Sequence, residues 1–315
     1  MTTKRCPQEE TRPMRLAVIG VPTNSSGTTD GVARAPAALR DAGLIELIGQ
    51  VCDVSDYGDV EFTPPASGRS QASGIIAEES LASMIEGVRV AVAGALADGR
   101  FPLVVGGDCP ILIGCLAALR DCGRKFGVLF LDGHEDAYPP RQSPTGEAAD
   151  MELGLLLGAD GELPAFLAGS TPALSPADVV VLGARDREIL AREGVRSISD
   201  RVRVVSDDDL IEGDIEGLTR SAMEQVLAGK KDCVWLHVDL DVLSSHALPA
   251  VDYQQPGGLG WEDLKVITEI AVGSGHVVGW NLTIYNPDLD PDLSGARRIN
   301  EYVVHVICSL FARHR

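Results

Sequence analysis

Short apolar runs alternate with longer amphipathic segments along most of the chain. The apolar runs have the length of buried strands. They predict strands at residues 16–21, 101–105, 125–131, 179–182, 233–236 and 277–284. The longer segments predict helices at residues 36–42, 77–97, 110–123, 218–227, 262–271 and 298–312. This alternation predicts an α/β fold, with one mostly parallel sheet and helices on both of its faces.

No composition shift or linker divides this pattern. Residues 63–74 are rich in proline, serine and glycine and predict a loop, and the sequence contains no internal repeat. Residues 1–14 are polar and lack the apolar core of a signal peptide. We therefore expect a polar N-terminal tail at 1–14 and a single domain at 15–315.

The end of the predicted strand at 125–131 carries unusual polar residues. Asp132, His134 and Asp136 follow it at every second position. If the strand continued, these side chains would point to the same face. Crowded carboxylates and an imidazole are costly to bury unless a cation holds them. This spacing predicts a divalent metal site.

Two other predicted strands end in similar residues, and the carboxyl ends of parallel strands share one edge of a sheet. The combined set exceeds what one tetrahedral ion needs, so a two-metal cluster with bridging carboxylates explains it better. The alternative is a set of capped strand ends and solvated loops. The set comprises Asp108, Cys109, Asp132, His134, Asp136, Asp239 and Asp241.

These residues resemble, in order and spacing, the metal motifs of the arginase/agmatinase (ureohydrolase) family. That family usually reads G-G-D-H, D-A-H-x-D and S-x-D-x-D. The resemblance covers about residues 15–312. The corresponding segments here are Gly106-Gly107-Asp108-Cys109, Asp132-Gly133-His134-Glu135-Asp136 and Asp239-Leu240-Asp241, with Gly257-Gly258 downstream and Ala33-Arg34-Ala35-Pro36 near the start.

The resemblance implies a three-layer α/β/α catalytic domain with a binuclear manganese cluster. A hydroxide activated by the metals would attack a guanidino carbon to release urea, and Asp136 would take or relay its proton. Family members are commonly trimers or hexamers, so we expect a homo-oligomer. One metal would be held by Cys109, Asp132, Asp136 and Asp239, and the other by Asp132, His134, Asp239 and Asp241.

Cys109 departs from the family pattern, because it stands where the first histidine ligand is expected. Its place before Pro110, at a predicted helix N-terminus, would favour a thiolate. A thiolate ligand favours Zn²⁺ or Fe²⁺ over Mn²⁺. The alternatives are a buried free cysteine beside a weakened or one-metal site, and a cysteine nucleophile, which would leave the carboxylates unexplained.

Ile284 is the second departure, since alignment of Asn286-Pro287 places it where the family has a substrate-binding glutamate. A guanidinium buried against Ile284 would lack its charge partner, at a cost of roughly several kcal/mol. This argues against plain arginine as the substrate. An N-hydroxyguanidine, another modified guanidino compound, an amidine, a ureido group or an amide fits better.

The loop at 137–151 lacks the family's proton-shuttling histidine. Glu147 and Asp150 could do acid–base work or, with Thr145, bind the substrate, but solvated loop acids are equally common. Glu188 falls where the family binds a substrate α-amino group. His246 is favoured as an exposed loop residue over a proton shuttle.

Composition narrows the partners. The chain of 315 residues has a formal net charge of −19, which repels nucleic acid and anionic membranes and leaves a small molecule as the expected partner. Seven cysteines, without a C-x-x-C pair, argue against a disulfide framework. No apolar run reaches the ~18 residues that span a bilayer. We expect a cytoplasmic protein.

Three functions remain open from the sequence. The favoured one is a metal-dependent hydrolase of linear, non-peptide C–N bonds. The others are a non-catalytic binding or regulatory protein on the same fold, and a single-zinc, deacetylase-like amide hydrolase. Two metals, no metal or one zinc per chain would separate them.

Overall fold

An eight-stranded sheet forms the centre of the computed structural model, which describes residues 15–158, 164–169, 171 and 173–312. Every strand pair is parallel, in the order β2-β1-β3-β8-β7-β4-β5-β6. The strands are β1 (Arg15–Val21), β2 (Asp53–Asp59), β3 (Arg100–Gly106), β4 (Phe126–Leu131), β5 (Val179–Leu182), β6 (Arg203–Val205), β7 (Cys233–Asp239) and β8 (Val277–Thr283).

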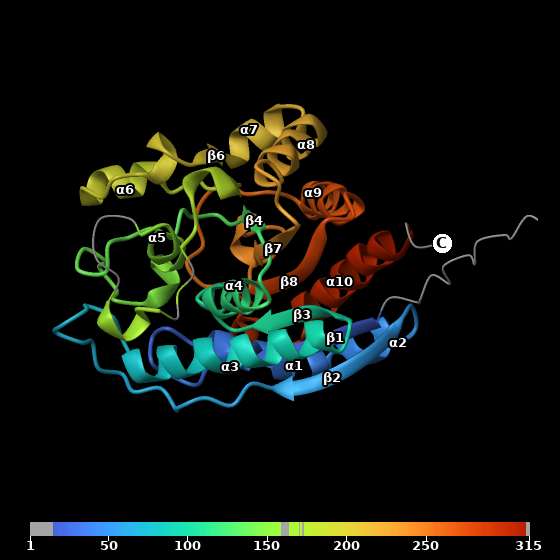
Figure 1. Cartoon of the computed structure of the whole chain (residues 1–315), viewed down its shortest axis with the longest axis horizontal. Coiled ribbons are helices and arrows are strands. Elements are labelled where there is room, and N and C mark those ends of the chain that lie inside the picture. Colours follow the sequence, from blue (N-terminus) through green and yellow to red (C-terminus); the bar gives the residue numbers. More distant parts are fainter. Residues whose placement is uncertain (1–14, 159–163, 170, 172, 313–315) are drawn as a thin grey trace, which may run out of the picture.

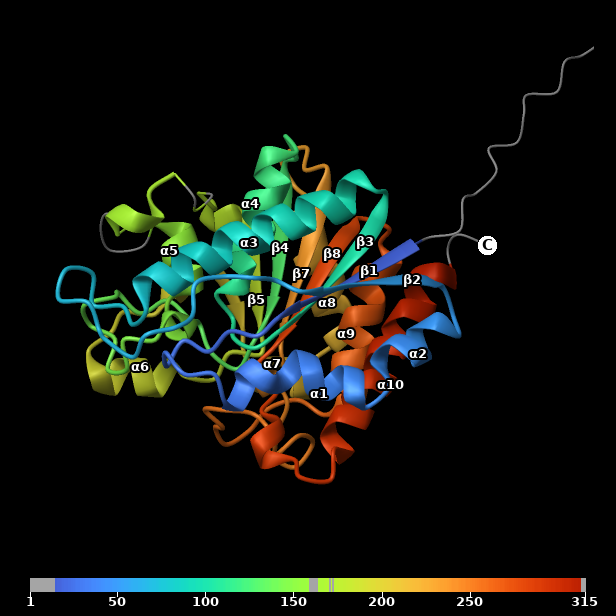
Figure 2. The ribbon, with the colours of Figure 1, turned by 90° about the horizontal axis from the view of Figure 1, so that it is seen from below.

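Helices cover both faces of this sheet (Figures 1 and 2). One apolar core lies between the sheet and α3, α4 and α5, and a second lies between the sheet and α1, α2, α8, α9 and α10. The predicted three-layer α/β/α architecture is confirmed. The helices are α1 (Ala35–Asp41), α2 (Leu44–Gly49), α3 (Glu78–Ala97), α4 (Ile111–Asp121), α5 (Glu152–Leu157), α6 (Arg187–Glu193), α7 (Asp207–Glu212), α8 (Ile215–Val226), α9 (Trp261–Gly273) and α10 (Ser294–Ala312).

Burial on both faces explains the continuous apolar runs of the central strands. All residues of β7 are buried, and so are all of β4 after Phe126. In the helix layer that covers these strands, α3 and α4 approach each other closely at Gly114, which has no side chain. A Cβ on Gly114 would lie 2.7 Å from the carbonyl oxygen of Ile85. The apolar pattern therefore follows directly from the two covering layers.

The predicted strands and helices are confirmed to within a few residues. Pro110 caps α4 at its N-terminus, and the helix proper begins at Ile111. The sequence analysis missed β2, which is a polar edge strand with no apolar run. Arg40 contacts that edge through ion pairs with Asp56 (2.9 Å) and Asp59 (2.5 Å). The sequence analysis also missed the short elements α2, α5, α6, α7 and β6.

The predicted tail at 1–14 lies outside the described residues, and the single domain at 15–315 stays a prediction. Six described cysteines are free thiols. By length and composition α3 could cross a membrane, with 39% of the window buried, but core helices of globular proteins pass the same test.

The four central strands place the chemistry. β3 and β4 are consecutive strands in the sequence. In the sheet, however, β8 and β7 lie between them. The carboxyl ends of β3, β8, β7 and β4 therefore meet at one edge, where open α/β sheets bind their ligands.

Candidate metal centre and substrate pocket

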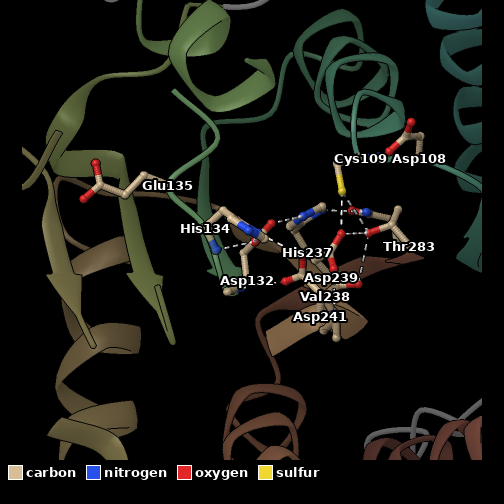
Figure 3. A network of polar contacts seen from close by, with 12 residues as sticks. Asp108, Cys109, Asp132, His134, Glu135, His237, Val238, Asp239, Asp241 and Thr283 are labelled. Carbon is tan, nitrogen blue, oxygen red and sulfur yellow. Dashed lines mark hydrogen bonds and ion pairs between the residues drawn. The ribbon is translucent and has the colours of Figure 1, made fainter. Parts of the chain in front are cut away.

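The structure brings all six predicted metal ligands to this edge, and Figure 3 labels all of them except Asp136. Cys109 follows β3, and Asp239 closes β7. Potential ligand atoms lie within 4.8 Å of one another in three groups, and Asp132 belongs to all of them. The groups are Asp132, His134 and Asp136; Asp132, Asp239 and Asp241; and Cys109, Asp132, Glu152 and His237.

Tight turns, rather than strand alternation, gather these side chains. β4 ends at Leu131, as predicted, so the strand alternation from which the convergence of Asp132, His134 and Asp136 was inferred does not apply to them. Asp132 Oδ1 accepts a hydrogen bond from the backbone N–H of His134 at 2.7 Å, and Asp136 has a left-handed φ of 41°. After β7, Asp239 Oδ1 likewise accepts from the N–H of Asp241 at 2.7 Å. Side chain-to-backbone bonds of this kind form turns.

Asp108 was counted with the cluster, but it has another role. Its Oδ2 accepts from the N–H of Ser25 at 2.7 Å, and its Oδ1 accepts from the N–H of Cys109 at 3.2 Å. It belongs to none of the three donor groups. Asp108 therefore ties the loop after β1 to the loop after β3.

The cluster carries more negative charge than its protein surroundings balance. Burial and the neighbouring acids raise the pKa of Asp136 and of Asp239 well above the usual range. Burial opposes the ionisation of Asp132 as well, but His134 and His237 outweigh it and lower the pKa of Asp132 to about 2. His134 Nδ1 lies 2.9 Å from Asp241 Oδ2.

These residues fit a pair of divalent cations. Asp132 Oδ2 and both carboxylate oxygens of Glu152 are buried without a hydrogen-bond partner. Unpaired buried carboxylate oxygens are costly, and a cation offsets that cost. Carboxylates with one imidazole suit Mn²⁺, whereas the Cys109 thiol shifts the preference of its own position toward Zn²⁺ or Fe²⁺.

Cys109 is buried and contacts the cluster directly. Its Sγ lies 2.5 Å from Asp239 Oδ2 and 3.4 Å from Thr283 Oγ1. The expectation of a thiolate favoured by the helix N-terminus is wrong for these surroundings. Burial, followed by the charge of Asp239, raises the pKa of the Cys109 thiol well above its usual value. Only a bound cation would make the thiolate favourable here.

Two members of the cluster were missed. Glu152, at the start of α5, is fully buried. It belongs to none of the three metal motifs, so nothing in the sequence singled it out. His237 is fully buried within β7. A sequence signal for His237 existed, because it stands where the S-x-D-x-D motif has serine.

A chain of hydrogen bonds fixes the tautomer of His237. The Trp235 indole N–H donates to Asn281 Oδ1 at 2.7 Å. An indole can only donate, so the Asn281 NH₂ group must face His237 Nδ1, which lies 2.6 Å away. Nδ1 is then the acceptor, and the ring proton sits on Nε2, 3.7 Å from Asp132 Oδ2. His237 thus presents an N–H group to the cluster rather than a lone pair.

A cavity of about 340 Å³ opens above the cluster. Cys109, His134, Asp136, Asp239 and Asp241 form its floor. Its walls include Tyr138, Thr145, Glu147, Asp150, Asp186, Ile189, Glu193, Tyr253 and Ile284. Among the predicted substrate-contacting residues, Thr145, Glu147 and Ile284 therefore reach the pocket.

The polar wall is held by hydrogen bonds. Tyr253 donates to Glu147 Oε2 at 2.7 Å, and Thr145 Oγ1 donates to Asp150 Oδ2 at 2.8 Å. Burial raises the pKa of Glu147, and it raises that of Asp150 to about 6. Tyr138 donates to Glu193 Oε2 at 2.8 Å.

Two residues that the sequence suggested as functional, Glu188 and His246, do not line the pocket. Glu188 is exposed on α6 and is absent from the pocket lining, so its proposed amine contact stays a prediction. The same helix turns Glu193 toward the pocket, beside Asp186. His246 is exposed, as favoured, and does not line the cavity.

Ile284 forms an apolar, strained part of the wall. It is 4% exposed and has a φ of 70°. A β-branched residue seldom adopts this left-handed conformation. Its backbone N–H donates to the carbonyl of Gly107 at 2.7 Å, which ties the end of β8 to the loop after β3.

Comparisons with known proteins agree with this arrangement. The Arginase family model matches residues 14–311. The arginase of Brevibacillus brevis is 29% identical over 291 residues, covering 90% of this chain and 94% of that protein. The arginase structure from Bacillus caldovelox superposes with a TM-score of 0.80 at 26% identity, covering 95% of this chain and 98% of that chain.

A wider fold likeness extends to a formimidoylglutamase from Bacillus subtilis. Its TM-score is 0.72 at 19% identity, covering 96% of this chain and 89% of that chain. Relatives that carry different substrate names thus share this fold. The chain belongs to the arginase family, whose members are hydrolases of amidine C–N bonds that depend on two metal ions, typically manganese.

Proposed function

We propose that the chain hydrolyses a linear C–N bond in a guanidino-type compound whose reacting group is neutral or weakly basic. The observation that carries this proposal is the contrast between an acidic floor and the buried Ile284 in the wall. The floor supports metal-dependent hydrolysis. The wall gives a buried guanidinium no carboxylate at the position where the family resemblance expects one.

The floor residues, together with Asp132 beneath them, would hold two divalent ions, with Mn²⁺ favoured at the oxygen-rich position. The proposed ligands are Cys109, Asp132, His134, Asp136, Asp239 and Asp241. When bound, the metals lower the pKa of water and supply a nucleophilic hydroxide near neutral pH. Asp132 and Asp239 would bridge the two ions.

Asp136 and Glu147 are the proposed proton carriers. Asp136 lines the floor, where it can accept a proton released during attack. Glu147 lies on the wall, and the Tyr253 hydroxyl holds its carboxylate in place. Its pKa is raised above that of an ordinary glutamate and so lies closer to neutral pH. This suits the carboxyl group to donate a proton to the leaving amine as a general acid.

The rim of the pocket favours a substrate with an amino group. Asp186 and Glu193, at the two ends of α6, both line the cavity. Asp186 is 3% exposed, and its Oδ1 has no hydrogen-bond partner. An ammonium group in the cavity would compensate the negative charge of Asp186 and Glu193. We infer an amino-acid-like substrate whose reacting end is less basic than that of arginine.

The test is a substrate panel with several divalent metals. The purified protein is loaded with Mn²⁺, Zn²⁺ or Fe²⁺ and assayed for urea and ammonia with arginine, N-hydroxyarginine, ureido, amidino and amide compounds. We expect turnover of a neutral or weakly basic guanidino relative above that of arginine. Preference for arginine would refute the substrate proposal. One zinc with amide cleavage, or no metal and no turnover, would support the alternative functions.

A further inference from the structure

Glu152 is the least compensated acid in the cluster. It is fully buried, no hydrogen bond of ordinary length and angle reaches its carboxylate oxygens, and the side chain that interacts with it at close range is another acid, Asp136. Its ligand atom lies within 4.8 Å of those of Cys109, Asp132 and His237. A buried charge without partners is strongly unfavourable, so the site requires either a proton or a cation at this carboxylate.

The position of Glu152 separates it from the substrate. Cys109 and Asp136 line the pocket, whereas Glu152, Asp132 and His237 do not. Glu152 therefore lies on the protein side of the cluster, beneath the floor. From there it can reach an ion beside Cys109, but it cannot contact a molecule in the pocket.

His237 does not compete for that ion as a ligand. The Trp235–Asn281 chain places its proton on Nε2, so the atom nearest the cluster is a donor. The metal-binding atoms of this group are then Cys109 Sγ and oxygens of Asp132 and Glu152. A thiolate and carboxylates can share a small divalent ion at bond lengths of about 2.0–2.3 Å.

We propose that Glu152 is a ligand of the metal ion beside Cys109, completing a Cys109–Asp132–Glu152 set that the family motifs do not contain. His237 then acts as a positioning residue, directing its Nε2–H toward the carboxylates. This inference rests on the proposed two-metal centre but is independent of the substrate.

The experiment compares wild type, Glu152→Gln and Glu135→Gln. Glu135 is the matched control, because it is also buried but points away from the cluster (Figure 3). Its oxygens accept from Ser197 Oγ at 2.6 Å and from the N–H of Ile198 at 2.7 Å. Metal content per chain is measured after loading with Mn²⁺, Zn²⁺ or Co²⁺. Titration with Co²⁺ follows the sulfur-to-cobalt charge-transfer absorption.

We expect wild type and Glu135→Gln to bind two ions. Glu152→Gln should weaken one of them by roughly 10–100-fold or more, the range for loss of a supporting residue at a metal site. The ion lost should be the one with the thiolate absorption. If Glu152→Gln binds both ions with unchanged affinity, the inference is wrong. If wild type binds none, the proposed function itself fails.

Thermal unfolding of the metal-free proteins separates a ligand from a structural residue. Without metal, Glu152→Gln removes an uncompensated acid, so it should unfold at or above the temperature of wild type. A lower unfolding temperature would mean that Glu152 supports the fold, which overturns the inference. Glu152→Asp keeps the charge but shortens its reach, and it should also weaken the ion beside Cys109.

Discussion

The floor and the wall of the pocket differ in how they compare with the family pattern. The floor keeps the family's ligand types except at Cys109, and it is built at the carboxyl ends of the buried strands β3, β4 and β7. The wall comes from the loop at 137–151, the region around α6, the segment at 253–255 and the segment after β8, and it differs from the family pattern at Ile284. The comparison indicates that reaction type is set by the floor, and substrate choice by the wall.

The largest expected effect comes from breaking the floor. Asp239→Ala removes a proposed bridge, so both ions and at least roughly 10³-fold of the activity should be lost. Metal analysis and kcat/KM measure this. Asp290→Asn is the control, because Asp290 is buried at another site and accepts from Tyr285 and Ala296. Retention of two ions by Asp239→Ala would contradict the bridging role.

The next change tests the wall. Ile284→Glu supplies the missing carboxylate and removes a β-branched residue from a left-handed conformation. Its kcat/KM for arginine should rise by about 100-fold, because a buried guanidinium gains a charge partner worth a few kcal/mol. Ile284→Gln is the neutral control. A similar gain in that variant would show that shape, not charge, limits arginine.

Cys109→His tests the one unusual position of the floor. It should fold and shift metal preference toward Mn²⁺ over Zn²⁺ by about tenfold, since an imidazole replaces a soft thiolate. Competition dialysis measures the ratio. Cys115→Ala, at another buried thiol in α4, should leave the ratio unchanged. Unaltered preference in Cys109→His would exclude Cys109 as a ligand.

A smaller difference separates Glu147, an acid of the pocket wall, from Glu188, an exposed acid outside the pocket. Glu147→Gln should lower kcat by about tenfold and flatten the pH profile of kcat, because Glu147 faces the pocket. Glu188→Gln should change kcat/KM by less than about twofold, as surface substitutions usually do. A large effect of Glu188→Gln on KM alone would restore its predicted role in binding the substrate amine.

The smallest effect is a pH dependence of the metal-free protein. Asp136, Glu152 and Asp239 have pKa values raised above those of the unfolded chain, first of all by burial. Above about pH 4 the folded state therefore binds more protons than the unfolded state, and stability falls as pH rises. Metal-free protein should melt a few degrees lower at pH 8 than at pH 5. Added metal should remove this difference, and a rise in stability with pH would contradict it.

The sequence was sufficient for six of the eight strands and for six polar residues that the structure gathers at one edge of the sheet, because apolar strands ending in acids have a strong pattern. It misassigned the local geometry, since Asp132–Asp136 forms a turn. It could not reveal Glu152, which only the folded chain brings within 4.8 Å of the ligand atoms of Cys109 and Asp132. It also could not show that α6 turns Glu193, not Glu188, toward the pocket, because that depends on the orientation of one short helix.

The edge strand β2 shows the same limit in the fold. Its polar residues Asp53–Asp59 contain no strand-like apolar run. Pairing with β1 and the ion pairs of Arg40 supply what its own sequence lacks. Non-local contacts of this kind leave no periodic signal.

Asp132 belongs to all three donor groups, so the two ions of the proposed centre would share this carboxylate. The first ion would fix the Asp132 carboxylate and reduce repulsion among the acids, but it would also add positive charge that the second ion meets. By linkage, each ion would change the affinity of the other by the same factor. The metal concentration at which activity appears would then be set by this coupling, and not by two separate dissociation constants.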